Sequence, residues 1–421
     1  MTKYSRGIFS SFANYPFRFA VFFCMAFVTH SSSLWAGGLY LEEFATPSMG
    51  VASAGAEAVC MDASSSFHNP AGMTRLKGNE FMLTGGLLGG TAEFNPDSST
   101  TISGGDGGDA LGYAPLLGAF YVRSLSEDWK LGISLLSLSG AALDYGDNWA
   151  GRYQCQNVSL TTLSLTPTIA YRVNDWLSVG GGVTAMYGML DLELDISFPR
   201  LPEDGHAELD GDDFAAGYNL AVLLEPSKRT RLGVTYWSKV EPEFSGDLET
   251  KGGPLGGFSL GSDTDLTFPQ FIRGGVYHEL DDKWALLGTV AWEDWSEMEN
   301  LLISINSETG KVPRNWDDTW HFAVGAHYRI DDQWLLQGGI AHDTNPVDSK
   351  DRTSDMPIDR QHRVTLGIQQ KRDDKKTYGL VLEYIDFGEA KIKSSSVRSG
   401  DFNGKFDKNW ALILAFNVNW K

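Results

Sequence analysis

Five basic side chains in the second half of the chain could bind an anionic group, because each falls in a segment where apolar and polar residues alternate. By the parity of that alternation, all five lie on the more polar face of their segment. They are Arg273, His321, His327, Arg329 and Arg363. The alternative is that they pair with acids on the same faces, such as Glu293 and Glu383, because a buried charge needs a partner.

Patterns typical of catalysis and of metal binding are weak in this chain. It contains no Gly-x-Ser-x-Gly motif, and the sequence places no serine beside His321 or His327, which a hydrolytic Ser/His pair would require. Cys60 and Cys155 lie in no Cys-x-x-Cys or Cys/His cluster. Whether these two cysteines pair with each other stays open, since two isolated cysteines do not define a disulfide framework. We therefore expect no enzyme, no metal and no cofactor.

The segments that carry these side chains have the period-two pattern of strands. In the last twelve residues, 410–421, one face is apolar along its length with a tryptophan near each end, and the other face is small or polar. The apolar face consists of Trp410, Leu412, Leu414, Phe416, Val418 and Trp420. A soluble sheet buries such a face in a core, whereas a membrane strand turns it toward lipid and places aromatics at the interfaces. The pattern predicts a membrane-spanning strand.

Fourteen segments are predicted to form strands of this kind. Their ranges are 80–94, 113–123, 129–140, 158–172, 176–195, 213–225, 230–241, 265–279, 284–296, 319–330, 334–343, 361–371, 376–388 and 408–421. Short polar turns alternate with long loops rich in Gly, Asp, Ser and Asn, which is typical of outer-membrane barrels. We therefore expect an all-β membrane fold, a 14-stranded antiparallel transmembrane β-barrel over residues 79–421, closed because an open edge in lipid leaves backbone groups unpaired. A soluble β-sandwich or propeller is the alternative.

Residues 1–36 are expected to be a signal peptide. Basic residues precede an apolar run at 19–28, and Ala36 precedes two glycines as a plausible cleavage site. The run is too short to span a bilayer, so a membrane anchor is the less favoured alternative. The chain has 421 residues and a formal net charge of −20, which makes nucleic acid an unfavourable partner.

Residues 37–78 do not have a strand pattern and are rich in small side chains, especially over 49–56. Small residues let a segment pack closely inside another structure, so this region is expected to form a plug, or hatch, in the lumen. A periplasmic tail is the alternative. Asn69, Pro70 and Ala71 are expected to set a turn where the plug meets the wall and to take part in gating.

Five apolar residues of the expected plug are candidates for lining a ligand-binding pocket. They are Leu39, Leu41, Phe44, Met49 and Phe67. For each of them, plain packing of the plug against the wall is the alternative.

Three parts of the chain resemble the long-chain fatty-acid transporters, the FadL and toluene-porin family. They are Gly37-Gly38-Leu39-Tyr40-Leu41 with the Ala-rich stretch to Ser64 and His68-Asn69-Pro70-Ala71-Gly72-Met73; Leu232 to Ser238; and Gly338 to Val347, continuing to Arg352, Pro357, Asp359 and Arg360. The resemblance covers nearly the whole mature chain. One departure is that family members commonly end in an aromatic residue, whereas here Trp420 is followed by Lys421.

The resemblance implies a monomeric plugged barrel for lipid transport in the bacterial outer membrane. The implied cargo is long-chain fatty acids or related hydrophobic compounds, moving by passive, ligand-gated diffusion with lateral exit through the barrel wall. Arg329 and Arg363 are then candidate partners for a fatty-acid carboxylate. Aromatic hydrocarbons or alkanes are the alternative cargo, and a general porin, an adhesion receptor or an outer-membrane lipid hydrolase is less favoured. The other expected partners are outer-membrane lipid and lipopolysaccharide.

Overall fold

The computed structural model describes residues 44–421 apart from 138–139, 199–202, 253–255 and 306–307, and these residues belong to one compact unit. The expected signal peptide and the candidate pocket residues Leu39 and Leu41 lie outside the described part. In the part that is described, no helix is both long and apolar enough to cross a membrane.

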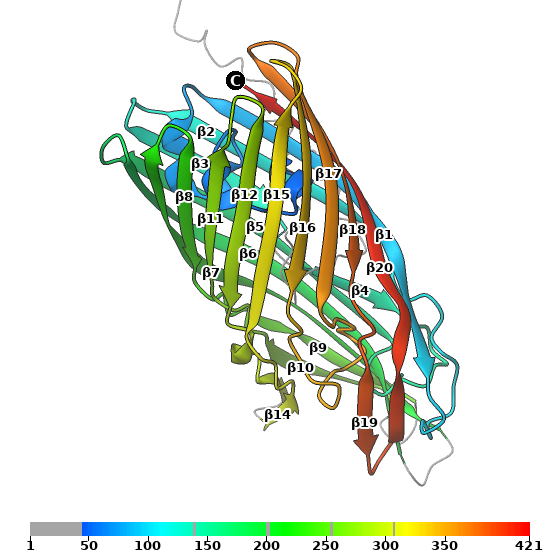
Figure 1. The fold of residues 1–421 in the computed structure, drawn as a ribbon. Helices are drawn as coiled ribbons and strands as arrows, with labels where there is room; N and C mark the ends of the chain where they lie inside the picture. Colours follow the sequence, from blue (N-terminus) through cyan, green and yellow to red (C-terminus); the bar gives the residue numbers. More distant parts are fainter. Residues whose placement is uncertain (1–43, 138–139, 199–202, 253–255, 306–307) are drawn as a thin grey trace, which may run out of the picture. The chain divides into compact units, whose positions relative to one another are not determined.

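The described strands form a closed ring of fourteen antiparallel members, which is the wall of a barrel (Figure 1). The ring closes because β1 (Glu80–Pro96) pairs along its length with β20 (Gly400–Trp420). The other twelve are β2 (Tyr113–Ser124), β3 (Trp129–Leu136), β5 (Asn157–Arg172), β6 (Leu177–Ile196), β7 (Gly205–Ser227), β8 (Thr230–Trp237), β11 (Phe271–Glu279), β12 (Trp284–Glu293), β15 (Thr319–Arg329), β16 (Trp334–Asp343), β17 (Gln361–Lys371) and β18 (Lys376–Asp386). The predicted 14-stranded barrel is confirmed.

Shorter strands lie mainly in segments that the sequence predicted as long loops. They are β4 (Gly140–Asp144), β9 (Glu243–Lys251), β10 (Phe258–Asp265), β13 (Asn300–Ile305), β14 (Glu308–Pro313) and β19 (Ile392–Ser396). β9 and β10 form one hairpin, β13 and β14 form another, and β10 pairs with β13 to join them. The loop prediction was too simple here because polar segments can gain their backbone hydrogen bonds by pairing with each other, which composition does not reveal.

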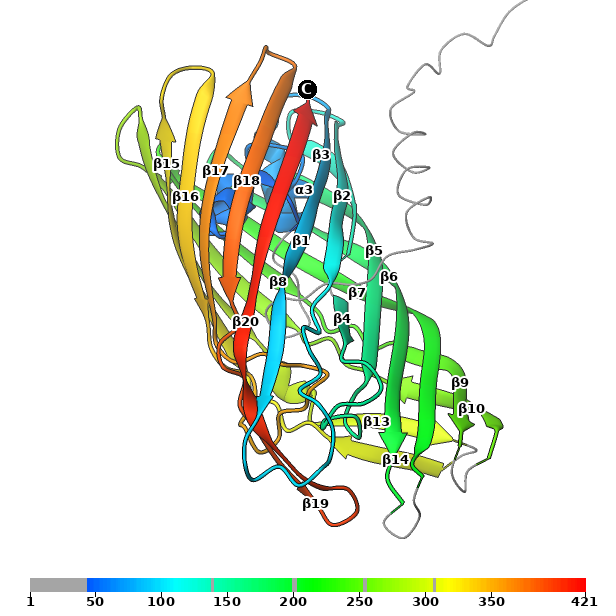
Figure 2. The ribbon, with the colours of Figure 1, turned by 90° about the vertical axis from the view of Figure 1, so that its right-hand side faces the viewer.

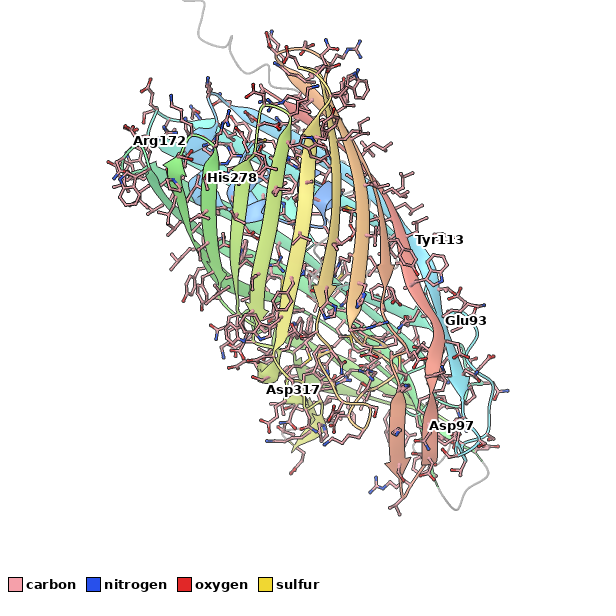
Figure 3. The ribbon with its side chains drawn as sticks, viewed as in Figure 1. Glu93, Asp97, Tyr113, Arg172, His278 and Asp317 are labelled. Carbon is pink, nitrogen blue, oxygen red and sulfur yellow. The ribbon has the colours of Figure 1, made fainter. Side chains whose placement is uncertain are left out.

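The two ends of the barrel differ. The carboxyl terminus and the short turns share one end, which we call the turn end, and β9, β10, β14 and β19 lie at the other, the loop end (Figures 1 and 2). Arg172 and His278 lie toward the turn end, and Asp97 and Asp317 lie toward the loop end (Figure 3). Short turns are periplasmic and long loops extracellular in barrels of this type.

Along the wall strands, an apolar lipid-facing side alternates with a smaller or more polar inner side. In β17, Val364 and Leu366 are 54% and 64% exposed, and Thr365 between them is buried. In β20, Leu414 and Phe416 are similarly exposed. A continuous apolar surface of this kind is stable in lipid and unstable in water. The lipid-facing side predicted from the last twelve residues is therefore confirmed.

Short helices fill the barrel near the turn end (Figure 2). They are η1 (Pro47–Val51), α2 (Ala56–Val59), α3 (Ser65–His68) and η2 (Pro70–Arg75). η1 contacts β15 to β18, α2 contacts β8 and β11, α3 contacts β2 and β3, and η2 contacts β3 and β5 to β7. Residues 44–75 are therefore enclosed by the wall as a plug and do not extend from it as a tail.

Glycines on the inner side of seven wall strands let the plug lie directly against the wall. At each of them, an added Cβ would come within 3.0 Å of a plug atom. They are Gly132, Gly180, Gly233, Gly275, Gly325, Gly339 and Gly367. Gly233 faces the carbonyl oxygen of Glu57, and Gly339 faces the backbone of Val51. Side chains at these positions would push the plug out of contact with the wall.

Hydrogen bonds also fix the plug. The Asn69 side-chain amide donates to the carbonyl oxygen of Glu57 at 2.6 Å and to that of Val222 in β7 at 3.1 Å. The Thr289 hydroxyl of β12 accepts from the Gly55 amide at 2.8 Å. These bonds satisfy backbone groups that the short helices leave open, because a helix of one turn cannot satisfy its own ends.

The described ladder between β2 and β3 has two parts, and we call the stretch between them the seam gap. β2 pairs with β3 up to Gly118↔Leu136, and the next described pairing in the same register is the bridge Leu111↔Leu143; residues 138–139, between the two, lie outside the described part. Along the gap, β2 pairs with β1, and β4 pairs with β5. Tyr113, on the β2 edge of the gap, lies on the outside of the barrel (Figure 3).

Replacing Gly275 by valine is expected to loosen the plug and to lower the free energy of unfolding by about 1–3 kcal/mol, the usual cost of overpacking. A Cβ at Gly275 would lie 2.5 Å from a Glu57 carboxylate oxygen, whereas the nearest atom to a Cβ at Gly274 lies 3.8 Å away. Gly274→Val is therefore the matched control. Urea unfolding in lipid vesicles and hydrogen exchange of residues 44–75 measure the two effects. Equal values for both variants would contradict the packing role of Gly275.

Candidate functional site

An apolar cavity lies inside the barrel toward the loop end, and we call it the loop-side pocket. Its lining comes from the inner side of β5 and β6 and from segments that follow β10, η4 (Trp295–Glu297), β14 and β16. The lining residues are Val158, Leu160, Leu190, Leu192, Leu266, Met298, Leu301, Arg314, Trp316, Asp355 and Met356. All but Arg314 and Asp355 are apolar. A concave apolar site with a few polar groups at one side is typical of small-molecule binding.

The strand side of this pocket follows from register. Val158 and Leu160 of β5 lie opposite Leu192 and Leu190 of β6, so four apolar side chains form one patch. Further toward the turn end, the same side of β5 carries hydroxyl residues, beginning with Thr162. The apolar patch is therefore confined to the loop-end half of these strands.

One ion pair borders the loop-side pocket. The Arg314 guanidinium donates from Nη1 and Nη2 to the two Asp355 carboxylate oxygens, at 2.9 and 2.7 Å, and from Nη1 to the Thr353 hydroxyl at 2.6 Å. Arg314 and Asp355 are only 8% and 7% exposed. Burial opposes ionisation, but the attraction and hydrogen bonds between the partners lower the pKa of Asp355 and raise the pKa of Arg314. Both groups stay charged, so the pair presents no net charge to the pocket.

The segment 344–360 folds inward beside the pocket and wraps around Arg352, which is buried. The hydrogen-bond partners of its guanidinium are the carbonyl oxygens of Val347, Ile358 and Lys391 and the side-chain oxygen of Asn345, at 2.6 to 2.9 Å. The Tyr145 hydroxyl donates to the Ser354 carbonyl oxygen at 2.7 Å and ties this segment to the neighbouring loop. These contacts hold Asp355 and Met356 against the pocket.

Apolar side chains connect the loop-side pocket with the plug. Leu266 lines the pocket, and Phe268, two residues later, lines a second apolar cavity together with Trp237. The Trp237 ring lies 4.9 Å from the ring of the plug residue Phe67, centroid to centroid. Trp237, Phe268 and Phe67 belong to one buried hydrophobic cluster that also includes pocket residues. One path of apolar side chains therefore leads from the loop-side pocket down to the plug.

The structure brings together three of the plug residues predicted to line a pocket. Phe44, Met49 and Phe67 are buried in that same cluster, and the rings of Phe44 and Phe67 are 4.8 Å apart. Phe67 is the residue that reaches the wall, at Trp237. Burial of this kind fits both ligand contact and plain packing, so a ligand-binding role stays a prediction.

The predicted turn of the plug lies at its contact with β6. Pro70 is the first residue of η2, and a Cβ at Gly180 of β6 would come within 3.0 Å of the backbone of Pro70 and Ala71. Asn69 precedes this contact and is fully buried. The three residues therefore lie where the sequence analysis expected them, and their part in gating stays a prediction.

Three of the five basic side chains predicted on the inner side are in contact with inner acids. The pairs are His321–Asp343 (2.7 Å), Arg363–Asp343, Arg363–Glu383 (3.7 Å) and Arg273–Glu293 (3.0 Å). This is the alternative that the sequence left open. Arg363 is therefore committed to carboxylates of the protein, and the network does not line the loop-side pocket.

The remaining two basic residues lie elsewhere. A hydrogen bond of 3.1 Å joins His327 Nε2 to the Gln337 side chain, close to η1. Arg329 is exposed beside a short turn and donates to the Asp282 carbonyl oxygen at 3.2 Å. Because this turn is at the end opposite the loop-side pocket, the position of Arg329 does not support the carboxylate-binding role predicted for it.

A serine–histidine contact occurs inside the plug, where the sequence analysis had not placed one. Ser48 Oγ and Thr46 Oγ1 each lie 3.0 Å from Nε2 of His68. Burial lowers the pKa of His68 to about 4, which makes it a weak base at neutral pH. The cluster therefore joins η1 to α3 and has little of the character of a hydrolytic pair.

The cysteine question left open by the sequence is settled by the structure. Cys60 and Cys155 are buried free thiols and do not pair. Over the described ranges, no group of three or more His, Cys, Asp or Glu side chains is placed to hold a metal ion.

The sequence analysis missed the loop-side pocket, because half of its residues come from segments treated as loops. Met298, Arg314, Trp316 and Met356 all lie in such segments. One usable signal was present. Large apolar residues such as Trp316 and Met356 in otherwise polar loops are disfavoured in water, which favours folding of the loop inward.

Comparisons with known proteins agree with this architecture. A family model described as outer membrane protein transport protein (OMPP1/FadL/TodX) matches residues 27–421. The long-chain fatty acid transport protein of Escherichia coli O6:H1 is 26% identical, over 92% of this chain and 95% of that protein. The crystal structure of a Pseudomonas aeruginosa FadL homologue covers 91% of this chain and 99% of its own, with 20% identity and a TM-score of 0.84. The Pseudomonas putida toluene transporter TodX covers 93% and 100%, with 16% identity and a TM-score of 0.68.

Replacing Arg363 by methionine is expected to lower the free energy of unfolding by about 3–5 kcal/mol, because Asp343 would stay buried without its cation. Arg363 is 1% exposed in its side chain. Arg329→Met makes the same change at an exposed position of β15 and is expected to cost less than about 0.5 kcal/mol. Urea unfolding of the protein in lipid vesicles compares the two. If they unfold at the same urea concentration, Arg363 is not committed to the network.

Proposed function

The chain belongs to the outer membrane protein transport family (OMPP1/FadL/TodX), and from this premise we propose that it admits long-chain fatty acids or related hydrophobic compounds by passive diffusion, with no catalytic step. Its location is the outer membrane, and members of the family are transporters or channels. The proposal includes a monomeric barrel surrounded by outer-membrane lipid and lipopolysaccharide.

The observation that carries the proposal is the path of apolar side chains between the loop-side pocket and the plug. A water-filled porin has a polar lumen. A sixteen-carbon chain gains on the order of 12 kcal/mol on leaving water, at about 0.8 kcal/mol for each methylene group. Such a molecule finds apolar contacts all the way to the plug, from the side chains of Leu266, Phe268, Trp237 and Phe67. A polar solute would gain nothing from this lining.

The plug is the proposed gate. A ligand that advances past Trp237 meets Phe67, which is packed against it at 4.9 Å. Displacing Phe67 moves α3, and Asn69 directly follows α3 with hydrogen bonds to Glu57 and to Val222 of the wall. Ligand binding would therefore disturb the contact that Asn69, Pro70 and Ala71 make with the wall.

The seam gap is the proposed exit. Its inner β2 edge carries Ala114 and Leu116, which are buried and apolar. The plug begins beside it, because the Thr84 hydroxyl donates to the Phe44 carbonyl oxygen at 2.8 Å and Thr84 is the register partner of Gly118. Lateral exit there releases an apolar molecule into lipid without passage through water, so a concentration difference is a sufficient driving force.

Filling the loop-side pocket is expected to weaken ligand binding. Met356→Trp puts a larger side chain into the lining and should lower the affinity for 1-decanol at least about tenfold, equivalent to about 1.4 kcal/mol. Val397 is fully exposed, so Val397→Trp is the control. Titration calorimetry of the protein in nanodiscs gives both affinities. Unchanged binding by Met356→Trp would place the ligand elsewhere.

Closing the seam gap is expected to stop uptake. Leu117 and Ser137 continue the register of Gly118↔Leu136 by one step, so a Leu117→Cys/Ser137→Cys pair can be oxidised at the border of the seam gap. Uptake of a hydrophobic probe into proteoliposomes should be lost on oxidation and restored by reductant. Tyr121→Cys/Ile133→Cys, within the intact ladder, should transport in both states. Full uptake by the oxidised 117/137 pair would rule out this exit.

A further inference from the structure

Among the described residues that line the loop-side pocket there is one cation, Arg314, and it is already occupied. Arg314 forms two hydrogen bonds with Asp355 and one with Thr353. A ligand carboxylate could bind Arg314 only by displacing Asp355, which is itself buried and would lose its partner. Arg314 is therefore not available as an anchor for an anion while Asp355 is ionised beside it.

Two further arginines at the loop end, Arg352 and Arg152, are engaged in the same way. Arg352 donates to four oxygen atoms of its own and a neighbouring segment. Arg152 forms ion pairs with Asp195 at 3.4 Å and with Asp204 at 3.2 Å. Each of these guanidinium groups stabilises a loop, and neither lines the pocket.

The strands behind the pocket add negative charge. In β6, Asp191 and Glu193 alternate with the pocket residues Leu190 and Leu192 on the opposite side of the strand. Asp191 lies opposite Asp210 of β7, and Glu193 lies opposite Glu208. Lys251 forms an ion pair with Glu208 at 3.2 Å, but the four acids outnumber it, so the local potential stays negative and lowers the concentration of anions near the pocket.

A carboxylate in this pocket would therefore leave water and lie near negative charge, with no free cation among the described lining residues to bind it. We infer that the loop-side pocket binds its ligand in uncharged form. Its ligands are hydrocarbons, aromatic compounds and alcohols, and carboxylic acids only when protonated. The inference rests on the proposed function and narrows its substrate class.

Two ligands that differ only in their headgroup test this inference. 1-Decanol and decanoate have the same chain length, and titration calorimetry of the wild-type protein in nanodiscs at pH 8 gives both affinities. We expect 1-decanol to bind at least about tenfold more tightly. As the pH falls from 8 to 6, the apparent affinity for decanoate should rise about tenfold for each pH unit, because its protonated fraction rises by that factor above an ordinary carboxyl pKa. The affinity for 1-decanol should stay constant.

A variant that frees Arg314 supplies the complementary test. Asp355→Asn removes the carboxylate that occupies Arg314 and should tighten decanoate binding at pH 8 at least about tenfold, with 1-decanol changed less than about twofold. Asp348→Asn removes one negative charge from an exposed position of the same segment and should change neither affinity.

The outcomes separate the inference from the function on which it rests. Decanoate that binds wild type as tightly as 1-decanol at pH 8, or a decanoate affinity that is flat between pH 8 and 6, overturns the inference and leaves the proposed function intact. If neither ligand binds, the proposed function itself fails. If Asp355→Asn does not fold, the wild-type pH series alone decides.

Discussion

The constraint on which the rest of this structure depends is that backbone N–H and C=O groups cannot be left unpaired in lipid. The pairing of β1 with β20 satisfies it by removing both edges of the sheet. Once the wall is closed, its outer surface must be apolar, as Val364, Leu366 and Phe416 are. Polar side chains and binding sites therefore have to lie inside the barrel or at its two ends.

Closing the wall leaves a lumen that has to be filled. A ring of fourteen strands leaves a lumen wider than side chains alone can fill, and here residues 44–75 fill its turn end. Glycines such as Gly233 and Gly275 let the plug backbone touch the wall, so the contact depends on the absence of side chains as much as on their presence. Beyond the plug, Phe67, Trp237 and Phe268 continue the apolar interior toward the loop end.

Most of the charged side chains that the structure describes inside the barrel have a partner of opposite charge or a hydrogen-bond partner. Arg363, Arg273 and Arg314 each have a carboxylate partner, and Arg352 is surrounded by carbonyl and amide oxygens. Unpaired charge in such an interior is costly, while a paired charge fixes geometry. The cations therefore hold strands and loops in place, and the apolar lining is what remains to meet a ligand.

The sequence by itself determined the strands, the closed ring and the plug, because period-two alternation and small-residue composition are local properties of neighbouring residues. It also placed Asn69 and Pro70 at the contact with the wall. Tertiary structure alone decided the partners of Arg363, the exposed position of Arg329 and the loop-side pocket, since each depends on residues far apart in the chain. Met298, Trp316 and Met356 become a lining only when two loops fold inward onto β5 and β6, and the pairing of Arg314 with Asp355 exists only in that arrangement.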